Sequence, residues 1–295
     1  MSERPADVAE VAAALEAHDY LADDSLATVV FLALRLDRPL FLEGEAGVGK
    51  TEVAKVLARW TGGELIRLQC HEGLDAAQAV YEWDYARQLL HLRAVEGSGV
   101  GAGAADLYDE RFLVRRPLLR ALESGGGSRP VLLVDEIDRA DDEFEAFLLE
   151  FLSEWAVTVP ELGAVRAGEP PIVVLTSNRT RDVHDALKRR CLYHWIDHPD
   201  REREVEIVRR RAPEAGAALA AEVAALVSQL RDLDLYKPPG VAESIAWAEA
   251  VNALGCASID ARTADLTLGA VVKYREDQER VRAHGLAALI AGTGS

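Results

Sequence analysis

The chain has 295 residues, of which 49% are hydrophobic and 28% charged, and its formal net charge is −17. This length suits one large and one small globular domain, and the strong negative charge argues against nucleic-acid binding, which needs a concentrated basic surface. The longest apolar run, residues 26–34, is too short to span a bilayer, and residues 1–10 carry no signal pattern. Three cysteines cannot build a disulfide framework, so we expect a cytoplasmic protein.

Hydrophobic periodicity predicts strands alternating with helices up to about residue 198. The first clear element is a helix over residues 24–36. Further expected elements are strands at 39–42, 65–68, 131–134, 172–175 and 193–196, helices at 51–61, 116–123 and 144–155, a hairpin at 157–165 and a short helix ending near 191. Residues 71–110 give no clear pattern, and their Gly/Ala/Ser-rich stretch at 97–105 predicts a loop.

From residue 199 onward the sequence is rich in Ala, Glu and Arg, with helical periodicity and no convincing strand. Strands alternating with helices, followed by helices alone, are typical of a parallel α/β core with a helical appendage. We therefore expect an α/β fold with a five-stranded parallel sheet in a core domain over residues 1–198, which includes N-terminal helices, and a small helical domain over 199–295.

Residues 44–51 match the phosphate-loop pattern G-x-x-x-x-G-K-[ST] between a predicted strand and a predicted helix. Glycines let backbone N–H groups surround a triphosphate, and the following helix directs the positive end of its dipole at the same anion. We expect Lys50 to reach the β- and γ-phosphates and Thr51 to hold Mg²⁺. The residues expected to bind the nucleotide are Gly44, Glu45, Ala46, Gly47, Val48, Gly49, Lys50 and Thr51. The alternative is a glycine-rich turn without a ligand.

Two acids follow the buried strand at 131–134 and form the second half of a nucleotide site. Asp135 is expected to hold Mg²⁺ through water, and Glu136 to polarise the water that attacks the γ-phosphate. The adjacent glutamate favours hydrolysis over phosphoryl transfer to another substrate. The alternative is an acidic residue that merely begins a turn.

Two later positions complete the candidate site. In a doubly wound sheet Asn178 would lie between the strand that bears Asp135 and the phosphate-loop strand, where its amide would orient the attacking water. Arg190, with Arg189 as second choice, ends the short helix before the fifth strand and would stabilise the transferring phosphoryl group of a neighbouring subunit. The alternatives are an ordinary loop start at Asn178 and solvated cations at a helix C-terminus.

Cys191, His194 and His198 have a spacing that suggests a metal site. A strand rises about 3.3 Å per residue and its side chains alternate between faces, so one ion cannot gather the first two from a regular strand. We therefore expect no metal there.

With the phosphate loop, the paired acids, the asparagine and the arginine in this order, the chain resembles AAA+ ATPases. It resembles more closely the MoxR group, and within it the CoxD-like members associated with carbon monoxide dehydrogenase maturation. The resemblance covers nearly the whole chain. It is carried by the stretches RPLFLEGEAGVGKTEVAKVLA, RPVLLVDEIDRADDEFEAFLLEFLSEW, PPIVVLTSNRTRDVHDALKRRCLYHWIDHPD and YKPPGVAESIAWAEAV. It implies a P-loop αβα core with a helical lid and an ATP- and Mg²⁺-binding site. It also assigns Lys50 and Thr51 to Walker A, Asp135 and Glu136 to Walker B, Asn178 to sensor 1 and Arg190 to the arginine finger.

The resemblance also implies a homo-oligomeric ring, usually a hexamer, that works with a von Willebrand A-type partner protein. Together they would remodel a client metalloenzyme or help its metal cofactor form. Residues 71–110 are not needed for ATP chemistry and are candidates for client or partner contacts. MoxR proteins commonly carry a lid arginine in a Gly-Ala-Ser-Pro-Arg-like stretch, whereas residues 240–244 here contain none and Lys237 is the nearest cation.

Three other functions fit parts of the pattern. A nucleotide-gated scaffold with negligible hydrolysis fits the missing lid arginine. A small-molecule kinase would share the phosphate loop but leaves Glu136 and the arginine before the fifth strand unexplained. A GTPase is disfavoured because no Asn-Lys-x-Asp or Thr-Lys-x-Asp segment occurs.

Overall fold

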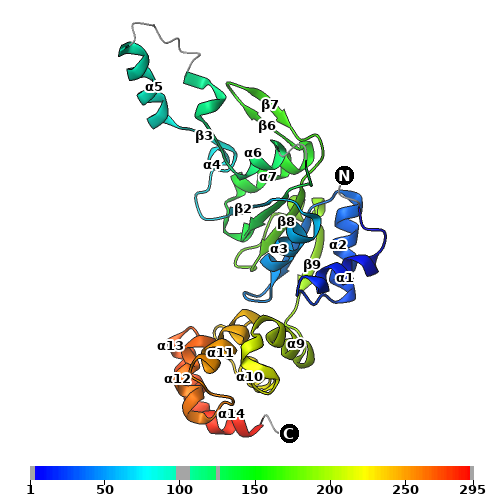
Figure 1. The fold of residues 1–295 in the computed structure, drawn as a ribbon, viewed down its shortest axis with the longest axis vertical. Helices are drawn as coiled ribbons and strands as arrows, with labels where there is room; N and C mark the ends of the chain where they lie inside the picture. The colour runs from blue at the N-terminus through cyan, green and yellow to red at the C-terminus, as the bar shows by residue number, and fades with distance from the viewer. Residues whose placement is uncertain (1–3, 98–106, 124–126, 293–295) are drawn as a thin grey trace. The chain divides into compact units, whose positions relative to one another are not determined.

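The computed structural model describes residues 4–97, 107–123 and 127–292 (Figure 1). Contacts between residues divide the chain into two compact units, each built from three segments. The first unit is Met1–Val11, Thr28–Glu43 and Ala54–His194, and the second is Ala12–Ala27, Gly44–Val53 and Trp195–Ser295. The second unit thus combines the phosphate loop with the C-terminal helices. The domain boundary near residue 198 stays a prediction.

The first unit contains most of a five-stranded parallel sheet, which confirms the expected α/β fold class. In spatial order its strands are β2 (Leu65–Gln69), β5 (Val131–Asp135), β8 (Ile172–Ser177), β1 (Leu40–Gly44) and β9 (Leu192–Ile196). All residues of β1, β5 and β8 are buried, as their continuous apolar runs predict for central parallel strands. As expected, β8 lies between β5 and β1, so Asn178 follows the strand between those of the two motifs.

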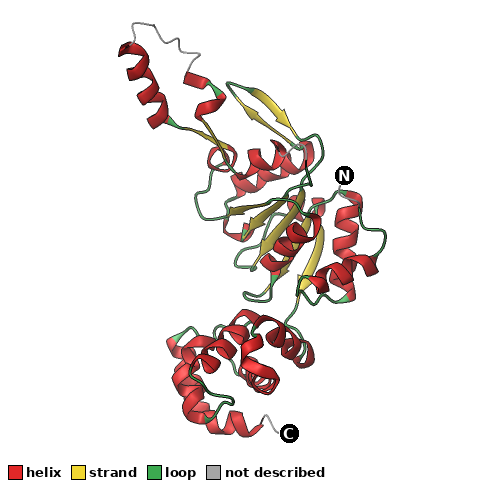
Figure 2. Ribbon diagram, in the orientation of Figure 1, coloured by secondary structure: helices red, strands yellow, loops and turns green. Residues whose placement is uncertain are grey.

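Helices and one hairpin accompany the sheet (Figure 2). They are α1 (Val8–Ala17), α2 (Asp24–Leu36), α3 (Lys50–Thr61), α6 (Pro117–Glu123), η3 (Ile137–Arg139), α7 (Asp142–Glu154), β6 (Ala156–Val159), β7 (Gly163–Arg166) and α8 (Asp185–Arg190). The Asp141 side chain caps α7 by accepting from the N–H of Phe144 at 2.9 Å, and Trp155 ends it in a left-handed conformation. Phe144 and Phe151 then pack in the core of this unit with Leu132.

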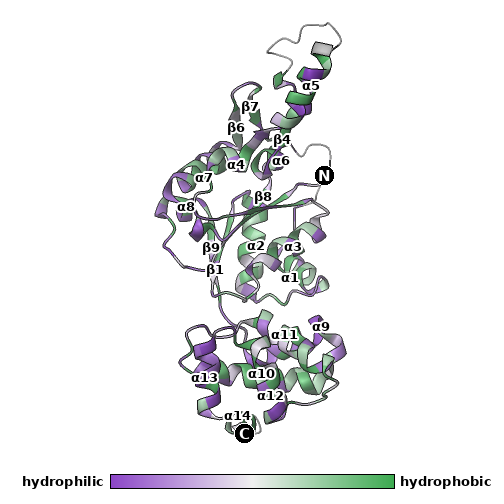
Figure 3. Ribbon diagram, turned by 90° about the vertical axis from the view of Figure 1, so that its left-hand side faces the viewer, coloured by the Kyte–Doolittle hydropathy of each residue, from purple (hydrophilic) through white to green (hydrophobic). Residues whose placement is uncertain are grey.

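The segment between β2 and β5 contains elements that hydrophobic periodicity did not predict. They are α4 (Ala76–Val80), β3 (Tyr81–Trp83), α5 (Tyr85–Gly97), η2 (Glu110–Phe112) and β4 (Leu113–Arg115). Strands β3 and β4 pair antiparallel although α5 separates them in the sequence. Leu89 and Leu90 of α5 are exposed, and Figure 3 shows hydrophobic and hydrophilic residues mixed along this helix. Residues 98–105 of the expected loop lie outside the described residues.

The C-terminal part of the second unit is helical, as predicted. Its elements are α9 (Arg201–Arg211), η4 (Pro213–Ala215), α10 (Gly216–Asp232), α11 (Val241–Ala253), α12 (Ala261–Val271), α13 (Arg275–His284) and α14 (Leu286–Gly292). These helices share one hydrophobic core, in which Val227, Trp247 and Leu268 are almost fully buried. Across the described parts of the chain, every helix is too short or too polar to cross a membrane.

Candidate active site

Glycines shape the phosphate loop between β1 and α3. Gly47 and Gly49 have φ angles of +83° and +97°, in the left-handed region that only glycine adopts readily. Gly44 is required for space, because a Cβ atom there would lie 2.4 Å from the carbonyl oxygen of Ile196. Larger residues at these three positions would therefore distort the loop.

Lys50 begins α3, and its side chain turns back over the loop. This residue is only 6% exposed, and its Nζ donates to the carbonyl oxygens of Gly44 at 2.8 Å and Glu45 at 2.6 Å. The N-terminus of α3 adds the partial positive charge of a helix start. Lysine and helix together make this end of the loop suited to an anion such as phosphate.

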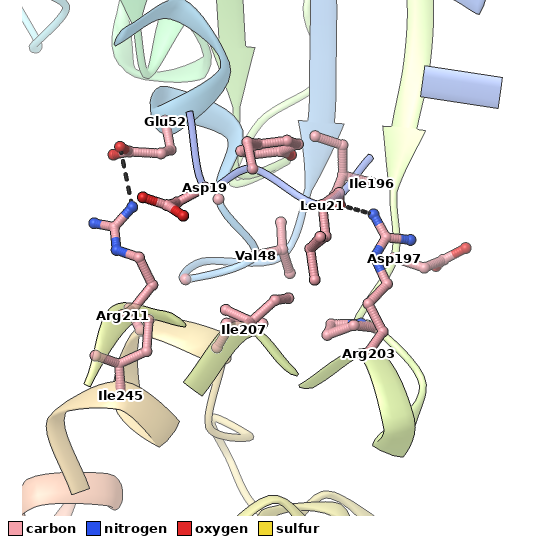
Figure 4. Close-up of a pocket in the computed structure, with 16 residues that line it drawn as sticks. Asp19, Leu21, Val48, Glu52, Ile196, Asp197, Arg203, Ile207, Arg211 and Ile245 are labelled. Carbon is pink, nitrogen blue, oxygen red and sulfur yellow. Dashed lines mark hydrogen bonds and ion pairs between the residues drawn. The ribbon is translucent and has the colours of Figure 1, made fainter. Parts of the chain in front are cut away.

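An apolar pocket lies beside the phosphate loop, within the second unit (Figure 4). Its hydrophobic lining consists of Leu21, Val48, Ile196, Ile207, Val241 and Ile245. Arg203 donates to the carbonyl oxygen of Leu21, and Arg211 pairs with Glu52 at 3.2 Å. Each arginine is thus tied to the protein itself, so the pocket offers mainly apolar surface.

Tyr20 also lines this pocket and is almost fully buried. Burial raises the pKa of Tyr20 well above its usual range, so the hydroxyl stays protonated at neutral pH. Its ring lies close to the loop, because a Cβ atom on Gly49 would be 3.6 Å from it. A protonated aromatic side chain therefore borders both the pocket and the phosphate loop.

Helix α11 begins directly against the phosphate loop. The N–H of Ala242 donates to the carbonyl oxygen of Gly47 at 3.2 Å. A Cβ atom on Gly240 would lie 2.6 Å from the carbonyl oxygen of Ala46, and the Glu243 side chain accepts from the N–H of Gly240 at 3.0 Å. The stretch that lacks the expected arginine thus meets the loop through its backbone and through the Glu243 carboxylate, whose Oε2 would lie 2.7 Å from a Cβ atom on Gly47. Lys237 is exposed and is not among the residues that line the pocket.

In the first unit, Asp135 ends β5 and is only 4% exposed. Its Oδ1 accepts from the Thr176 hydroxyl at 2.6 Å, and its Oδ2 accepts from Nε and Nη2 of Arg67 at 3.0 and 2.5 Å. Thr176 Oγ1 in turn accepts from the backbone N–H of Glu136 at 3.0 Å. These bonds fix the carboxylate of Asp135 relative to the next residue.

Glu136 adopts a left-handed conformation with φ of +56° and gathers three side chains. Its carboxylate accepts from Gln69 Nε2 at 3.0 Å and from Asn178 Nδ2 at 3.4 Å, and it pairs with Arg139 Nε at 3.1 Å. The structure therefore brings Asp135, Glu136 and Asn178 into one cluster of the first unit. Left-handed backbone at a residue other than glycine often marks functional sites.

Four residues of this cluster were not expected from the sequence: Arg67, Gln69, Thr176 and Arg139. One signal was available, because polar residues at positions 67 and 69 alternate with apolar ones at the end of a predicted strand. Parallel strands present their carboxyl ends at one edge of the sheet, where ligand sites form.

Glu43 is a further buried acid, at the end of β1 just before the phosphate loop. It accepts from the Ser177 hydroxyl at 3.1 Å and the Tyr193 hydroxyl at 2.9 Å, and Lys188 lies 3.9 Å away. Burial and the bond to Glu43 raise the pKa of Tyr193 to about 12, so this donor stays protonated. The sequence pattern did not single out Glu43, which joins three strands near the loop.

Arg189 and Arg190 are exposed at the end of α8. The Arg190 guanidinium donates to the carbonyl oxygens of Leu152 and Ser153, each at 3.3 Å, near the end of α7. Neither arginine belongs to the cluster around Glu136, so their expected role in a neighbouring subunit stays a prediction. His198 belongs to the group Cys191, His194 and His198, for which we expected no metal. Its Nε2 atom lies 3.1 Å from Oε2 of Glu45.

Comparison with known proteins places this geometry in a family. The profile of the AAA domain (dynein-related subfamily) matches residues 39–191, which is more than half of the chain. The gas vesicle ATPase GvpN2 of Halobacterium salinarum is 28% identical over 263 residues, which cover 84% of this chain and 73% of that protein. The denitrification regulatory protein NirQ of Stutzerimonas stutzeri is 26% identical over 217 residues, covering 70% of this chain and 68% of NirQ.

Two other similarities are more limited, the first in coverage and the second in sequence identity. Midasin of Giardia intestinalis is 32% identical over 108 residues, which cover 36% of this chain and only 2% of midasin. The P216G mutant of RuvB from Thermotoga maritima shares the fold, with a TM-score of 0.51 at 15% identity over 99% of this chain and 86% of that one. The family match, with its phosphate loop and paired acids, identifies the chain as a member of the AAA domain family of the dynein-related subfamily, an AAA+ ATPase of MoxR-like type.

Proposed function

We propose that this ATPase hydrolyses Mg²⁺–ATP at a site completed between subunits of a ring, and that the resulting motion remodels a client protein. The observation that carries the proposal is the cluster in which Glu136 is held beside Asp135 by Gln69, Arg139 and Asn178. A scaffold that only binds nucleotide has no need of an oriented carboxylate next to the metal-binding acid.

Nucleotide binding is assigned to the phosphate loop and the pocket beside it. The phosphates would lie on the backbone of residues 44–51, with Lys50 at the β- and γ-phosphates. The apolar pocket bordered by Tyr20 and Val48 suits a flat adenine ring. The Thr51 hydroxyl and the Asp135 carboxylate are hard oxygen donors that fit Mg²⁺. When bound, this ion would neutralise developing charge on the phosphates.

Hydrolysis is assigned to three further side chains. Glu136 would accept a proton from the attacking water, and Asn178, within 3.4 Å of it, would hold that water against the γ-phosphate. Arg190 of a neighbouring subunit, with Arg189 as the alternative, would stabilise the negative charge of the transition state. Both arginines are exposed, which a role across a subunit interface requires.

The most specific part of the proposal concerns the client protein. The CoxD-like resemblance favours a cytoplasmic hexamer that works with a von Willebrand A-type partner and matures a metalloenzyme. The relatives are named for gas vesicles and for regulation of denitrification, so related ATPases serve different processes. The exposed leucines of α5 are candidates for client contact.

Glu136→Gln tests the proposal directly. We expect phosphate release to fall by about 100-fold or more, the range for losing a general base, while ATP binding measured by calorimetry persists. Glu150→Gln, at an exposed position of the same unit, is the control and should keep wild-type turnover. Specific activity of the wild type should also rise with protein concentration as rings assemble.

The scaffold alternative predicts a different result. It is favoured by the lack of an arginine in residues 240–244, which meet the phosphate loop through backbone groups and the Glu243 carboxylate. In that case wild type and Glu136→Gln release phosphate at the same background rate. Binding of neither ATP nor ADP in the presence of Mg²⁺ would contradict both functions.

A further inference from the structure

We propose that Arg67 and Mg²⁺ compete for the same oxygen of Asp135, so that Arg67 sets the Mg²⁺ concentration that the ATPase requires. The inference rests on the proposed Mg²⁺–ATP function and adds a residue that none of the expected motifs contains. Arg67 would act through Asp135 as a positioning residue.

The hydrogen bonds of Asp135 leave little room for a further ligand. A carboxylate offers about four lone-pair sites. The Thr176 hydroxyl takes one on Oδ1, and two N–H groups of Arg67 converge on Oδ2 at 3.0 and 2.5 Å. Both hydrogen bonds from the guanidinium fall on Oδ2, so a metal ion, or a water molecule bound to it, can bind this oxygen only when Arg67 withdraws.

Arg67 and Mg²⁺ are both positively charged, so each disfavours binding of the other at Asp135. A guanidinium is always protonated, and a divalent ion at the same carboxylate would repel it across a few ångströms. Asp135 is buried, so solvent screens this repulsion poorly. The two cations therefore exclude one another from Oδ2.

Arg67 is the partner that can leave. Its side chain is 55% exposed, whereas Thr176 is 1% exposed and fixed in the centre of the sheet. A half-exposed guanidinium recovers water when it swings away, so its withdrawal costs little. Its contact with the Asp135 carboxylate can thus break at a small cost in free energy when Mg²⁺ binds.

The pairing of β2 with β5 places Arg67 where this exchange also reaches Glu136. Gln69 lies opposite Asp135 in the register, and Arg67 shares a face of β2 with Gln69. Arg67 Nη2 donates to Gln69 Oε1, and Gln69 Nε2 donates to Glu136 at 3.0 Å. Withdrawal of Arg67 therefore removes one of the bonds that orient the amide holding Glu136.

The test is the Mg²⁺ requirement for nucleotide binding. A fluorescent, non-hydrolysable ATP analogue is titrated with Mg²⁺ against wild type, Arg67→Gln and Arg67→Lys. We expect the half-saturating Mg²⁺ concentration to fall about two- to fivefold in Arg67→Gln, the range for losing a partly exposed ion pair. Arg67→Lys keeps the charge and should stay near wild type. Arg120→Gln, which removes an exposed pair with Glu64 in the same unit, should leave the requirement unchanged.

Failure of this inference is distinguishable from failure of the proposed function. If wild type binds the analogue but Arg67→Gln needs as much Mg²⁺ or more, competition is refuted. If wild type shows no Mg²⁺-dependent binding at all, the Mg²⁺–ATP function itself fails. A measurement without substitution is the ¹⁵N spectrum of arginine side chains, in which the Nε signal of Arg67 should shift when Mg²⁺ and the analogue are added together. An unchanged signal would also refute the competition.

Discussion

Replacing Gly240 by alanine should separate helix α11 from the phosphate loop. Gly240 does not have a positive φ, so the added methyl group acts through space alone. It would lie 2.6 Å from the carbonyl oxygen of Ala46 and 2.9 Å from the Cα of Gly47, both backbone atoms that cannot rotate away. Overpacking of this kind costs about 1–3 kcal/mol. For a chain of this size we expect the melting temperature to fall by roughly 2–10 °C.

ATP affinity should fall as well, because the clash falls on the loop that holds the phosphates. If the whole cost opposes nucleotide binding, 1–3 kcal/mol corresponds to a loss of about 5- to 150-fold in affinity. Thermal denaturation and titration calorimetry measure the two effects. Gly168→Ala is the matched control, since no atom lies within 4 Å of its added methyl group. If Gly240→Ala behaves like this control in both assays, the backbone contact between loop and helix is not tight.

Three further outcomes are expected. Arg190→Ala should lower turnover by about 10³-fold or more, and mixing it with Glu136→Gln should restore part of the activity, because each inactive subunit supplies what its neighbour lacks. No recovery on mixing would place the arginine elsewhere. Burial raises the pKa of Cys70 and Cys191 from 9.0 to about 12. At pH 8 both should therefore react far more slowly with a disulfide reagent than Cys256, and equal rates would contradict their burial. Because unfolded thiols ionise first, the free energy of unfolding should fall as pH rises from about 9 to 12.

Much of the fold was predictable because the local sequence of its central strands is distinctive. Strands β5 and β8 are continuous apolar runs between turn residues, and both appear within two residues of the expected bounds. The segment from α4 to β4 was not predictable. Strands β3 and β4 have only three residues each, and α5 separates the partners, so their pairing depends on contacts that no local pattern encodes.

The candidate site likewise has a part that the sequence predicted and a part that only the structure revealed. The phosphate loop and the acids Asp135 and Glu136 are contiguous in sequence, so spacing alone revealed them. Arg67 and Gln69 act on these acids from a strand more than sixty residues earlier, as their bonds to Asp135 and Glu136 show. Their part became visible only when the register between β2 and β5 was known. The roles of all these residues in catalysis stay predictions.

The left-handed backbone of Glu136 has a consequence for how two neighbouring acids can serve one reaction. Successive side chains of an extended strand point to opposite sides, so a straight continuation of β5 would send the two carboxylates apart. A single residue at φ of +56° breaks that alternation and lets Glu136 reach Gln69, which lies opposite Asp135 in the register. Branched side chains such as valine or isoleucine tolerate this conformation poorly. Position 136 thus requires both a left-handed backbone conformation and an acidic side chain. Few substitutions can satisfy both requirements.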